Sequence, residues 1–339
     1  MSQQKAGVLE VSHLQIQYKS KGETVYAVED VSFSVNRGET FGLVGESGCG
    51  KSAACRAIAR LLPENGHISG GSVVFEGKDL TLLSEREMAD VRGRGVSMIF
   101  QEPMTSLNPV LSIRSQIDEV LRRRGVAISE RKAAAIDLLR MVDIPEPERR
   151  LKQYIHQFSG GMRQRAMIAL ALASKPALLL ADEPTTALDV TIQHQILMLL
   201  NRLKHELGMS MILVTHDLGV VRLVCDAVAV MYAGYIVEYA AVDALFSHPS
   251  HPYTLGLLNS LPRDEDDRVQ LEPIPGAPPD QSVRIKGCPF APRCPLADTL
   301  CENSLPPLID TGGSHLIRCH HHNGYDSNQN QRQGNKEGQ

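Results

Sequence analysis

Residues 40–52 read TFGLVGESGCGKS, a short apolar run followed at once by a glycine-rich loop, a lysine and a serine. The run predicts a buried strand, and the loop fits the pattern Gly-x4-Gly-Lys-Ser that follows such a strand and opens a helix. Its glycines permit backbone conformations that residues with a Cβ avoid, so successive N–H groups can point at phosphate oxygens. The predicted phosphate-binding residues are Gly45, Glu46, Ser47, Gly48, Cys49, Gly50, Lys51 and Ser52.

Two side chains at the end of this loop have predicted roles of their own. Lys51 is expected to reach the β and γ phosphates of a nucleotide, and the Ser52 hydroxyl to bind Mg²⁺. The alternative is a glycine-rich turn with a chance lysine, which the preceding strand disfavours. The loop therefore predicts ATP and Mg²⁺ as ligands.

Residues 177–184 read ALLLADEP, an apolar run that ends in two carboxylates. Asp182 at the strand tip is expected to hold the magnesium ion, and Glu183 to accept a proton from the attacking water. An acidic helix N-terminus is the alternative interpretation. His216, at the end of another apolar run, is a candidate for contact with the γ phosphate, although a lone histidine there is more often structural.

The composition is that of a globular protein. The chain has 339 residues, 42% hydrophobic and 22% charged, with a net charge of -4. This length suits one large domain with an appendage, and the charge gives no general attraction to nucleic acid. No apolar run reaches the roughly 18–20 residues of a membrane-spanning helix, and no secretion signal is recognised. We therefore expect a cytoplasmic protein with reduced thiols.

Strands and helices alternate along most of the chain. The predicted strands are residues 8–18, 31–35, 40–45, 73–77, 96–101, 177–184 and 210–217, and the predicted helices are residues 129–142, 161–174 and 190–207. The first strands alternate apolar and polar residues, whereas the later ones are continuously apolar, as in parallel sheets. This order indicates an α/β core.

After about residue 260 the sequence is charged and then rich in proline and glycine, which predicts a loop-built unit with a weak apolar core. This unit holds four of the seven cysteines, Cys288, Cys294, Cys301 and Cys319. Their separations of six, seven and eighteen positions match neither a zinc ribbon nor the ferredoxin run, so spacing alone identifies no metal. Chemistry alone favours zinc. The histidines at 320–322 are expected in an exposed tail, with spare metal ligands as the alternative.

Residues 158–165, FSGGMRQR, identify the type of P-loop protein, because with them the chain resembles the nucleotide-binding subunits of ABC transporters. Ser159, Gly160 and Gly161 open a predicted helix whose N-terminus can bind an anion. The resemblance implies that this end, with Met162, serves the ATP of a second subunit. Met162 departs from the family's usual glutamine, but the serine and glycines remain.

Further residues match the same family. By this resemblance, Gln101 in FQEP contacts magnesium and water, and residues 187–189, ALD, form a dimer contact. Tyr18 matches the aromatic residue that stacks on adenine, with Tyr26 as the alternative. The fold implied is α/β: a P-loop NTPase ABC nucleotide-binding domain, with a RecA-like core, an antiparallel β subdomain and a helical subdomain, plus a small loop-rich C-terminal extension.

The expected domain limits follow from the same comparison. The ATP-binding domain is expected over residues 8–258, with the helical subdomain at about 102–165. The extension is expected over residues 259–325, followed by a disordered tail at 326–339.

The extension narrows the resemblance. Residues 248–262, 274–279 and 287–295 look like the C-terminal extension of oligopeptide and dipeptide importer ATPases. That family implies a second ATPase subunit, two transmembrane permease subunits and a periplasmic or extracellular solute-binding protein. It also implies a peripheral position on the cytoplasmic face of the inner membrane. An importer motor for nickel, glutathione or another small solute is the alternative, and a nucleic-acid-associated ABC ATPase is a remote one.

The resemblance also bears on the four cysteines. Family members with cysteines at these positions hold a [4Fe-4S] cluster, so Cys288, Cys294, Cys301 and Cys319 are expected to do the same. Zinc and unligated thiols remain the alternatives.

Overall fold

The computed structural model describes residues 7–20, 22–102, 106–186, 188–260 and 274–322, so the expected tail at 326–339 lies outside it. The first half contains β1 (Gly7–Ser20), β2 (Glu23–Asn36), β3 (Thr40–Val44), α1 (Lys51–Ile58), β4 (Gly66–Phe75), β5 (Lys78–Asp79), α2 (Glu85–Arg94), β6 (Val96–Ile99), α4 (Ile113–Arg124), α5 (Ile128–Met141), α6 (Pro147–Arg150) and the turn η1 (Ile155–Gln157). The second half contains α7 (Gly160–Leu172), β7 (Leu178–Asp182), α8 (Val190–Leu207), β8 (Ser210–Thr215), α9 (Leu218–Val224), β9 (Ala227–Tyr232), β10 (Tyr235–Ala241), α10 (Val242–Ser247), α11 (Pro252–Asn259), η2 (Ala291–Arg293), α12 (Thr299–Asn303), β11 (Ile309–Asp310) and β12 (Leu316–Ile317).

The strands join in the order β5-β4-β1-β2-β10-β9-β3-β8-β7-β6. Strands β3, β8, β7 and β6 pair in parallel, and every residue of β3, β7 and β8 is buried. This confirms the predicted α/β core, because strands covered on both faces must be apolar throughout. Parallel strands also bring their carboxyl ends to one edge, where the loop after β3 meets the ends of β7 and β8.

A second, antiparallel layer lies at the other end of the sheet. Strand β1 pairs antiparallel with both β2 and β4, and β2 meets β10 through a single parallel pair, Tyr235 with Asp30. Leu14, Ile16 and Val28 of this layer are buried in one core cluster with Ala54 of α1. The helix that follows the phosphate loop is therefore held between the two layers.

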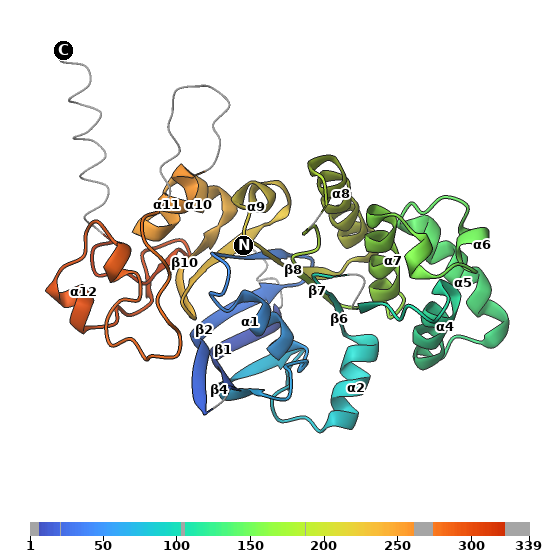
Figure 1. Cartoon of the computed structure of the whole chain (residues 1–339), viewed down its shortest axis with the longest axis horizontal. Coiled ribbons are helices and arrows are strands. Elements are labelled where there is room, and N and C mark those ends of the chain that lie inside the picture. The colour runs from blue at the N-terminus through green and yellow to red at the C-terminus, as the bar shows by residue number, and fades with distance from the viewer. Residues whose placement is uncertain (1–6, 21, 103–105, 187, 261–273, 323–339) are drawn as a thin grey trace, which may run out of the picture.

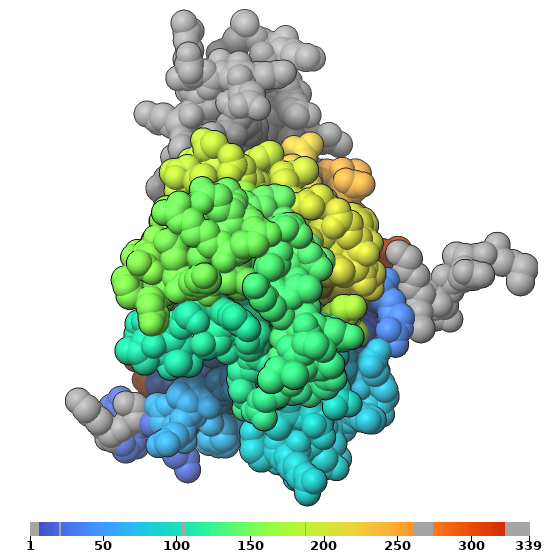
Figure 2. All heavy atoms as spheres, turned by 90° about the vertical axis from the view of Figure 1, so that its right-hand side faces the viewer, coloured from blue at the N-terminus to red at the C-terminus, as the bar shows by residue number. Residues whose placement is uncertain are grey.

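The helical region α4 to α7 stands apart from this layer, on the right of Figure 1. Its core is formed by one face of α4, including Ile113, Ile117 and Leu121, packed in one cluster with Leu139 of α5 and Ile168 of α7. In Figure 2, which faces that side, green residues of this region cover much of the surface. None of the helices in the described ranges is long and apolar enough to cross a membrane.

The described part of the extension is tied to the main sheet. Strand β12 pairs antiparallel with β10 through Ile317 and Glu238, and β11 pairs with β12. Phe290 is buried in one cluster with Tyr232 and Tyr253 of the ATP-binding part. The expected exposed tail at residues 320–322 is wrong, because these residues are partly buried and continue from β12.

Candidate functional site

The phosphate loop connects β3 to α1, and its glycines are needed for its shape. Gly45, Gly48 and Gly50 have φ angles of 150°, 82° and 106°, the region that residues with a side chain rarely adopt. A Cβ on Gly45 would lie 2.2 Å from the Met231 carbonyl oxygen, and one on Gly50 would lie 2.3 Å from the Ala27 carbonyl oxygen. The loop therefore packs directly against the ends of β9 and β2.

Lys51 begins α1 and is only 4% exposed. Its ammonium group donates to the carbonyl oxygens of Gly45, at 2.8 Å, and Glu46, at 2.9 Å. Burial raises the pKa of the neighbouring Cys49 thiol, which lies 3.7 Å from Nζ, so this cysteine stays protonated. The loop thus holds a buried cation where the sequence places the β and γ phosphates.

Ser52 and Asp182 meet across the sheet although 130 positions separate them. The Ser52 hydroxyl donates to Asp182 Oδ1 at 2.6 Å. Asp182 is fully buried, which raises its pKa, and its Oδ2 accepts no hydrogen bond from the described residues. Arg56 lies 3.9 Å from that oxygen. A buried carboxylate with a spare oxygen beside a hydroxyl is a donor set that suits Mg²⁺.

Glu183 follows Asp182 and is the centre of a second group. Its Oε2 accepts from the Gln101 amide at 3.1 Å and from the Thr186 hydroxyl at 2.9 Å. His216 Nδ1 lies 3.6 Å from Oε1. The ends of β6, β7 and β8 therefore bring together the three residues predicted to act in catalysis.

The two tyrosines considered for adenine stacking differ in their surroundings. Tyr18 is half-buried, which raises its pKa, and its ring packs against Gly66. Tyr26 lies under the Arg284 guanidinium, 4.7 Å from the ring centre, and its N–H donates to the Gln281 carbonyl. The extension thus occupies the face of Tyr26, which leaves Tyr18 as the better candidate.

A cavity of about 370 Å³ borders the phosphate loop. Loop residues Glu46 to Cys49 form one wall, and residues 278–281 of the extension form another. Val25, the cross-strand partner of Tyr18, also lines it. The cavity is therefore shared between the ATP-binding part and the extension.

The residues predicted to serve a second subunit lie elsewhere. Ser159 caps α7, and its Oγ accepts from the Met162 N–H at 3.4 Å. A Cβ on Gly161 would lie 3.1 Å from the Ile192 side chain, and one on Gly160 would lie 3.7 Å from Leu188. In Figure 1, β6 and β7 lie between α1 and α7. Helix α7 is therefore separated from the helix that follows the chain's own phosphate loop.

The expected dimer-contact residues 187–189 are described only in part, because Ala187 lies outside the described residues. Asp189 caps α8, and its Oδ1 accepts from the Ile192 N–H at 2.9 Å.

Known proteins share both parts of this sequence. The family described as ABC transporter matches residues 28–186, and the family described as oligopeptide/dipeptide transporter, C-terminal region, matches residues 237–301. The dipeptide transport ATP-binding protein DppD of Bacillus subtilis (strain 168) is 48% identical over 92% of this chain and 94% of its own. The oligopeptide transport ATP-binding protein OppD of Salmonella typhimurium is 49% identical over 92% of this chain and 93% of its own. The chain belongs to the ABC transporter family.

Solved structures agree with this assignment. A dimeric post-hydrolysis state of the ATP-binding cassette MJ0796 bound to ADP and Pi matches with a TM-score of 0.62 and 28% identity. The match covers 69% of this chain and 98% of that one. CbiO1 from Clostridium perfringens, part of an ABC transporter complex, matches equally well, with a TM-score of 0.62, 26% identity, and 71% and 91% coverage. The P-loop α/β fold is therefore that of an ABC cassette.

The four cysteines of the extension influence one another's pKa values. The pKa of Cys319 is raised to about 11, mainly by burial, and the neighbouring Cys288, Cys294 and Cys301 contribute to the same rise. The same holds for Cys294, whose pKa is also about 11 and responds to Cys288 and Cys301. The Cys288 N–H also donates to the Cys301 carbonyl oxygen at 2.7 Å, so the segments that carry these two cysteines are in contact. None of the four forms a disulfide.

Backbone N–H groups donate to two of these sulfurs. Leu296 N–H donates to Cys294 Sγ, and His321 N–H donates to Cys319 Sγ, each at 3.4 Å. A backbone hydrogen bond from Phe290 lowers the pKa of Cys288, against the larger effect of burial. These donors stabilise thiolates, which are the form that binds metal.

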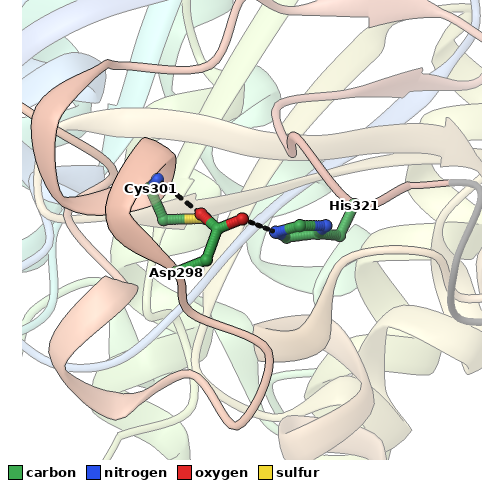
Figure 3. A group of neighbouring side chains, drawn as sticks. All are labelled: Asp298, Cys301 and His321. Carbon is green, nitrogen blue, oxygen red and sulfur yellow. Dashed lines mark hydrogen bonds and ion pairs between the residues drawn. The ribbon is translucent and has the colours of Figure 1, made fainter.

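Figure 3 shows a second group of potential metal ligands beside Cys301. Ligand atoms of Asp298, Cys301 and His321 all lie within 4.8 Å of one another. Asp298 Oδ1 accepts from the Cys301 N–H at 2.9 Å, and Oδ2 lies 3.1 Å from His321 Nε2. The carboxylate thus caps α12 and pairs with the imidazole.

Three residues at the site are missed by the sequence analysis. Arg293 of the extension binds the Glu46 carboxylate, the Tyr253 hydroxyl accepts from the Glu46 N–H, and Thr186 binds Glu183. Thr186 lies in the motif DEPTTALD, three residues after Glu183, so the motif could have identified it. Nothing in the spacing of Arg293 or Tyr253 links them to the phosphate loop.

Proposed function

We propose that this chain is the subunit that binds and hydrolyses ATP to drive an importer of dipeptides or oligopeptides. One observation supports this above others: a single chain combines a full set of ATP-site side chains with the C-terminal region of oligopeptide and dipeptide transporters. Relatives nearly half identical to it are named for the transport of these solutes.

The proposed chemistry assigns each group a task. The N–H groups of the phosphate loop and the Lys51 ammonium bind the phosphates, and Ser52 and Asp182 hold Mg²⁺. When bound, Mg²⁺ neutralises charge on the phosphate oxygens. Glu183 accepts a proton from the attacking water, while Gln101 fixes the orientation of its carboxylate.

The N-terminus of α7 has a proposed role in a second subunit. Since β6 and β7 lie between α1 and α7 in Figure 1, the N-terminal residues of α7, Ser159 to Met162, are suited to cover ATP bound to a partner. A dimeric cassette is known for the similar protein MJ0796. We infer that two ATPase subunits, of the same or different sequence, close around ATP.

Two membrane subunits are further proposed partners, and a hollow beside β6 is their proposed contact site. A hollow of about 220 Å³ beside β6 is lined mainly by apolar side chains, among them Met98, Phe100, Leu107 and Met167. Phe100 lines the hollow and directly precedes Gln101, which donates to Glu183, so a segment of a membrane subunit seated there could alter the catalytic group. We propose that the chain lies on the cytoplasmic face of the inner membrane, and that a periplasmic or extracellular protein delivers the solute.

The assembled complex provides the test. The tagged chain should co-purify with two multi-spanning proteins, and peptide-loaded binding protein should stimulate ATP hydrolysis by the complex in lipid. Stimulation by nickel or glutathione instead would change the solute assignment. Binding of nucleic acid with no membrane partner would contradict the transport function.

We also propose that Cys288, Cys294, Cys301 and Cys319 hold a [4Fe-4S] cluster. Four sulfurs around one zinc ion, at about 2.3 Å from the metal, would lie about 3.8 Å from one another. The group of ligand atoms found within 4.8 Å includes only Cys301 of the four. The N–H groups that donate to Cys294 and Cys319 suit thiolate ligands, and cysteine thiolates are the usual ligands of iron–sulfur clusters.

This cluster has a direct test. Protein purified without oxygen should be brown, absorb at about 400 nm and contain iron and sulfide. A colourless protein with one zinc ion per chain would contradict the cluster. Substituting Asp298 with Asn should leave the iron content unchanged if the four cysteines are the ligands, and should lower the zinc content if Asp298, Cys301 and His321 bind zinc instead.

A further inference from the structure

Arg293 links the extension to the phosphate loop. It ends η2, directly before Cys294, and its side chain is 5% exposed. Its guanidinium donates to both carboxylate oxygens of Glu46, at 2.7 and 3.0 Å. The same side chain donates to the Tyr232 hydroxyl at 3.2 Å and to the Pro275 carbonyl at 2.8 Å. This is a fork-shaped, charge-assisted contact with its remaining donors satisfied.

Every polar group of Glu46 is held by a different part of the chain. Arg293 holds the carboxylate, and the Tyr253 hydroxyl accepts from the backbone N–H at 2.9 Å. The backbone carbonyl accepts from Lys51 Nζ at 2.9 Å. A shift of the Glu46 carboxylate would therefore move the backbone that positions Lys51.

The energetics of the pair favour a stiff contact. A buried guanidinium that loses its carboxylate is left with an unpaired charge, which is strongly unfavourable. The hydrogen bonds to Glu46 are the main cause that raises the pKa of Arg293, so the arginine is charged at all physiological pH values. Because 247 positions separate the two residues, the contact joins two regions that the sequence leaves independent.

We propose that Arg293 is a positioning residue for ATP: by clamping Glu46 it fixes the phosphate loop in its binding conformation, so that the cysteine-bearing extension is part of the nucleotide site. The cavity between the loop and residues 278–281 fits this role, because the extension also forms its wall. Arg293 contacts none of the groups assigned to water activation, Gln101, Glu183 and His216. Its loss should therefore weaken ATP binding and leave the chemical step almost unchanged.

The test compares Arg293→Met with wild type in the full-length chain and in the assembled complex. We expect about a tenfold rise in the Kd of MgATP for the chain and in the KM of the complex, with kcat within about twofold. Arg293→Lys, which keeps the charge but loses the fork, should give an intermediate rise.

Arg318→Met is the matched control. Arg318 is also buried, also precedes a cysteine, and also binds a carboxylate, that of Asp30 at 2.7 Å, but it does not contact the phosphate loop. Its loss should weaken the contact of the extension with Asp30 but leave the Arg293–Glu46 contact in place, so the KM for ATP should rise no more than about twofold. Metal content and thermal stability, measured for both variants, show whether the extension is still assembled.

Combining Arg293→Met with Glu46→Gln tests the route of the effect. Both changes break the same contact. The KM of the double variant should therefore equal the KM of the single variant that binds ATP less tightly, and should not show the product of the two effects. An unchanged KM for Arg293→Met, an equal rise for Arg318→Met, or additive effects in the double variant would each overturn the proposal. If Arg293→Met does not fold, Arg293→Lys and Glu46→Gln still decide it.

Discussion

Glu183 is the residue whose geometry most directly suggests catalysis. Its φ angle of 46° is unusual for a residue with a side chain, and its carboxylate is held by Gln101 and Thr186. We expect Glu183→Gln to bind MgATP within about threefold of wild type but to hydrolyse it at least about a hundredfold more slowly, because the amide accepts no proton from water. Nucleotide binding and phosphate release by the same preparation measure the two properties.

The control for this variant is Glu206→Gln on the surface of α8. Glu206 lies 3.6 Å from Arg202 and is far from the site in sequence and fold. Its substitution should leave hydrolysis unchanged. Hydrolysis by Glu183→Gln at the wild-type rate would remove Glu183 from the role of base.

His251 gives a prediction about pH. It is 1% exposed at the start of α11, its Nδ1 accepts from the Tyr253 N–H, and burial lowers its pKa to about 4, against the opposing charge of Glu238. The folded chain therefore keeps His251 neutral where the unfolded chain protonates it, so stability falls as pH drops below about 6.5. This residue should cost about 2 kcal/mol of stability between pH 8 and pH 5.

Thermal unfolding at several pH values measures this effect. His251→Asn keeps an acceptor at the helix N-terminus but cannot be protonated, so its unfolding midpoint should depend less on pH between 8 and 5. An equal pH dependence in the variant and the wild type would contradict the assignment.

At the residue level, sequence motifs predict the groups expected to bind phosphate and metal. They do not predict the residues that hold the phosphate loop in position. Lys51, Ser52 and Asp182 lie in local patterns whose chemistry is dictated by the ligand. Arg293 and Tyr253 reach Glu46 only because α11 and η2 fold back onto β9, and no local pattern encodes that contact.

At the level of elements, the N-terminus of α7 offers a test of the two-subunit site. If Ser159 serves ATP held by the partner, as we propose, Ser159→Ala should slow hydrolysis by the complex at least about tenfold. ATP binding to the isolated chain should not change. Loss of a helix cap alone costs about 1 kcal/mol of stability.

Ser112→Ala is the matched control for that cost. Ser112 caps α4 in the same helical region, and its Oγ accepts from the Ser115 N–H at 3.2 Å. If both variants slow hydrolysis equally, Ser159 acts as a cap and has no role at the partner's ATP.

Among the elements, buried strands are predicted well and the β9–β10 hairpin is missed. Continuous runs of apolar residues predict β3, β7 and β8, independently of which elements cover these strands. The turn between β9 and β10 is Ala233-Gly234, both with positive φ, 45° and 83°. Such a turn usually contains Asn-Gly, and alanine in place of asparagine conceals the signal.

At the level of the whole molecule, the Arg293–Glu46 contact predicts that loss of the proposed metal centre weakens ATP binding. Cys294→Ser should lose the metal and also raise the KM for ATP about as much as Arg293→Met, because Arg293 precedes the lost ligand. The control is Cys225→Ser at the end of α9, outside the extension, which should affect neither property. Loss of metal with no change in KM would show that the centre and the phosphate loop are independent.

The central proposal is that this chain uses ATP hydrolysis to drive peptide uptake. The most direct measurement is the ATP-dependent accumulation of a labelled peptide in vesicles that contain the complete complex and its binding protein. We expect accumulation with the wild-type chain, and none with Glu183→Gln although the complex assembles and binds ATP. Peptide accumulation that persists with Glu183→Gln, or an absence of peptide uptake while another solute is taken up, would contradict the account.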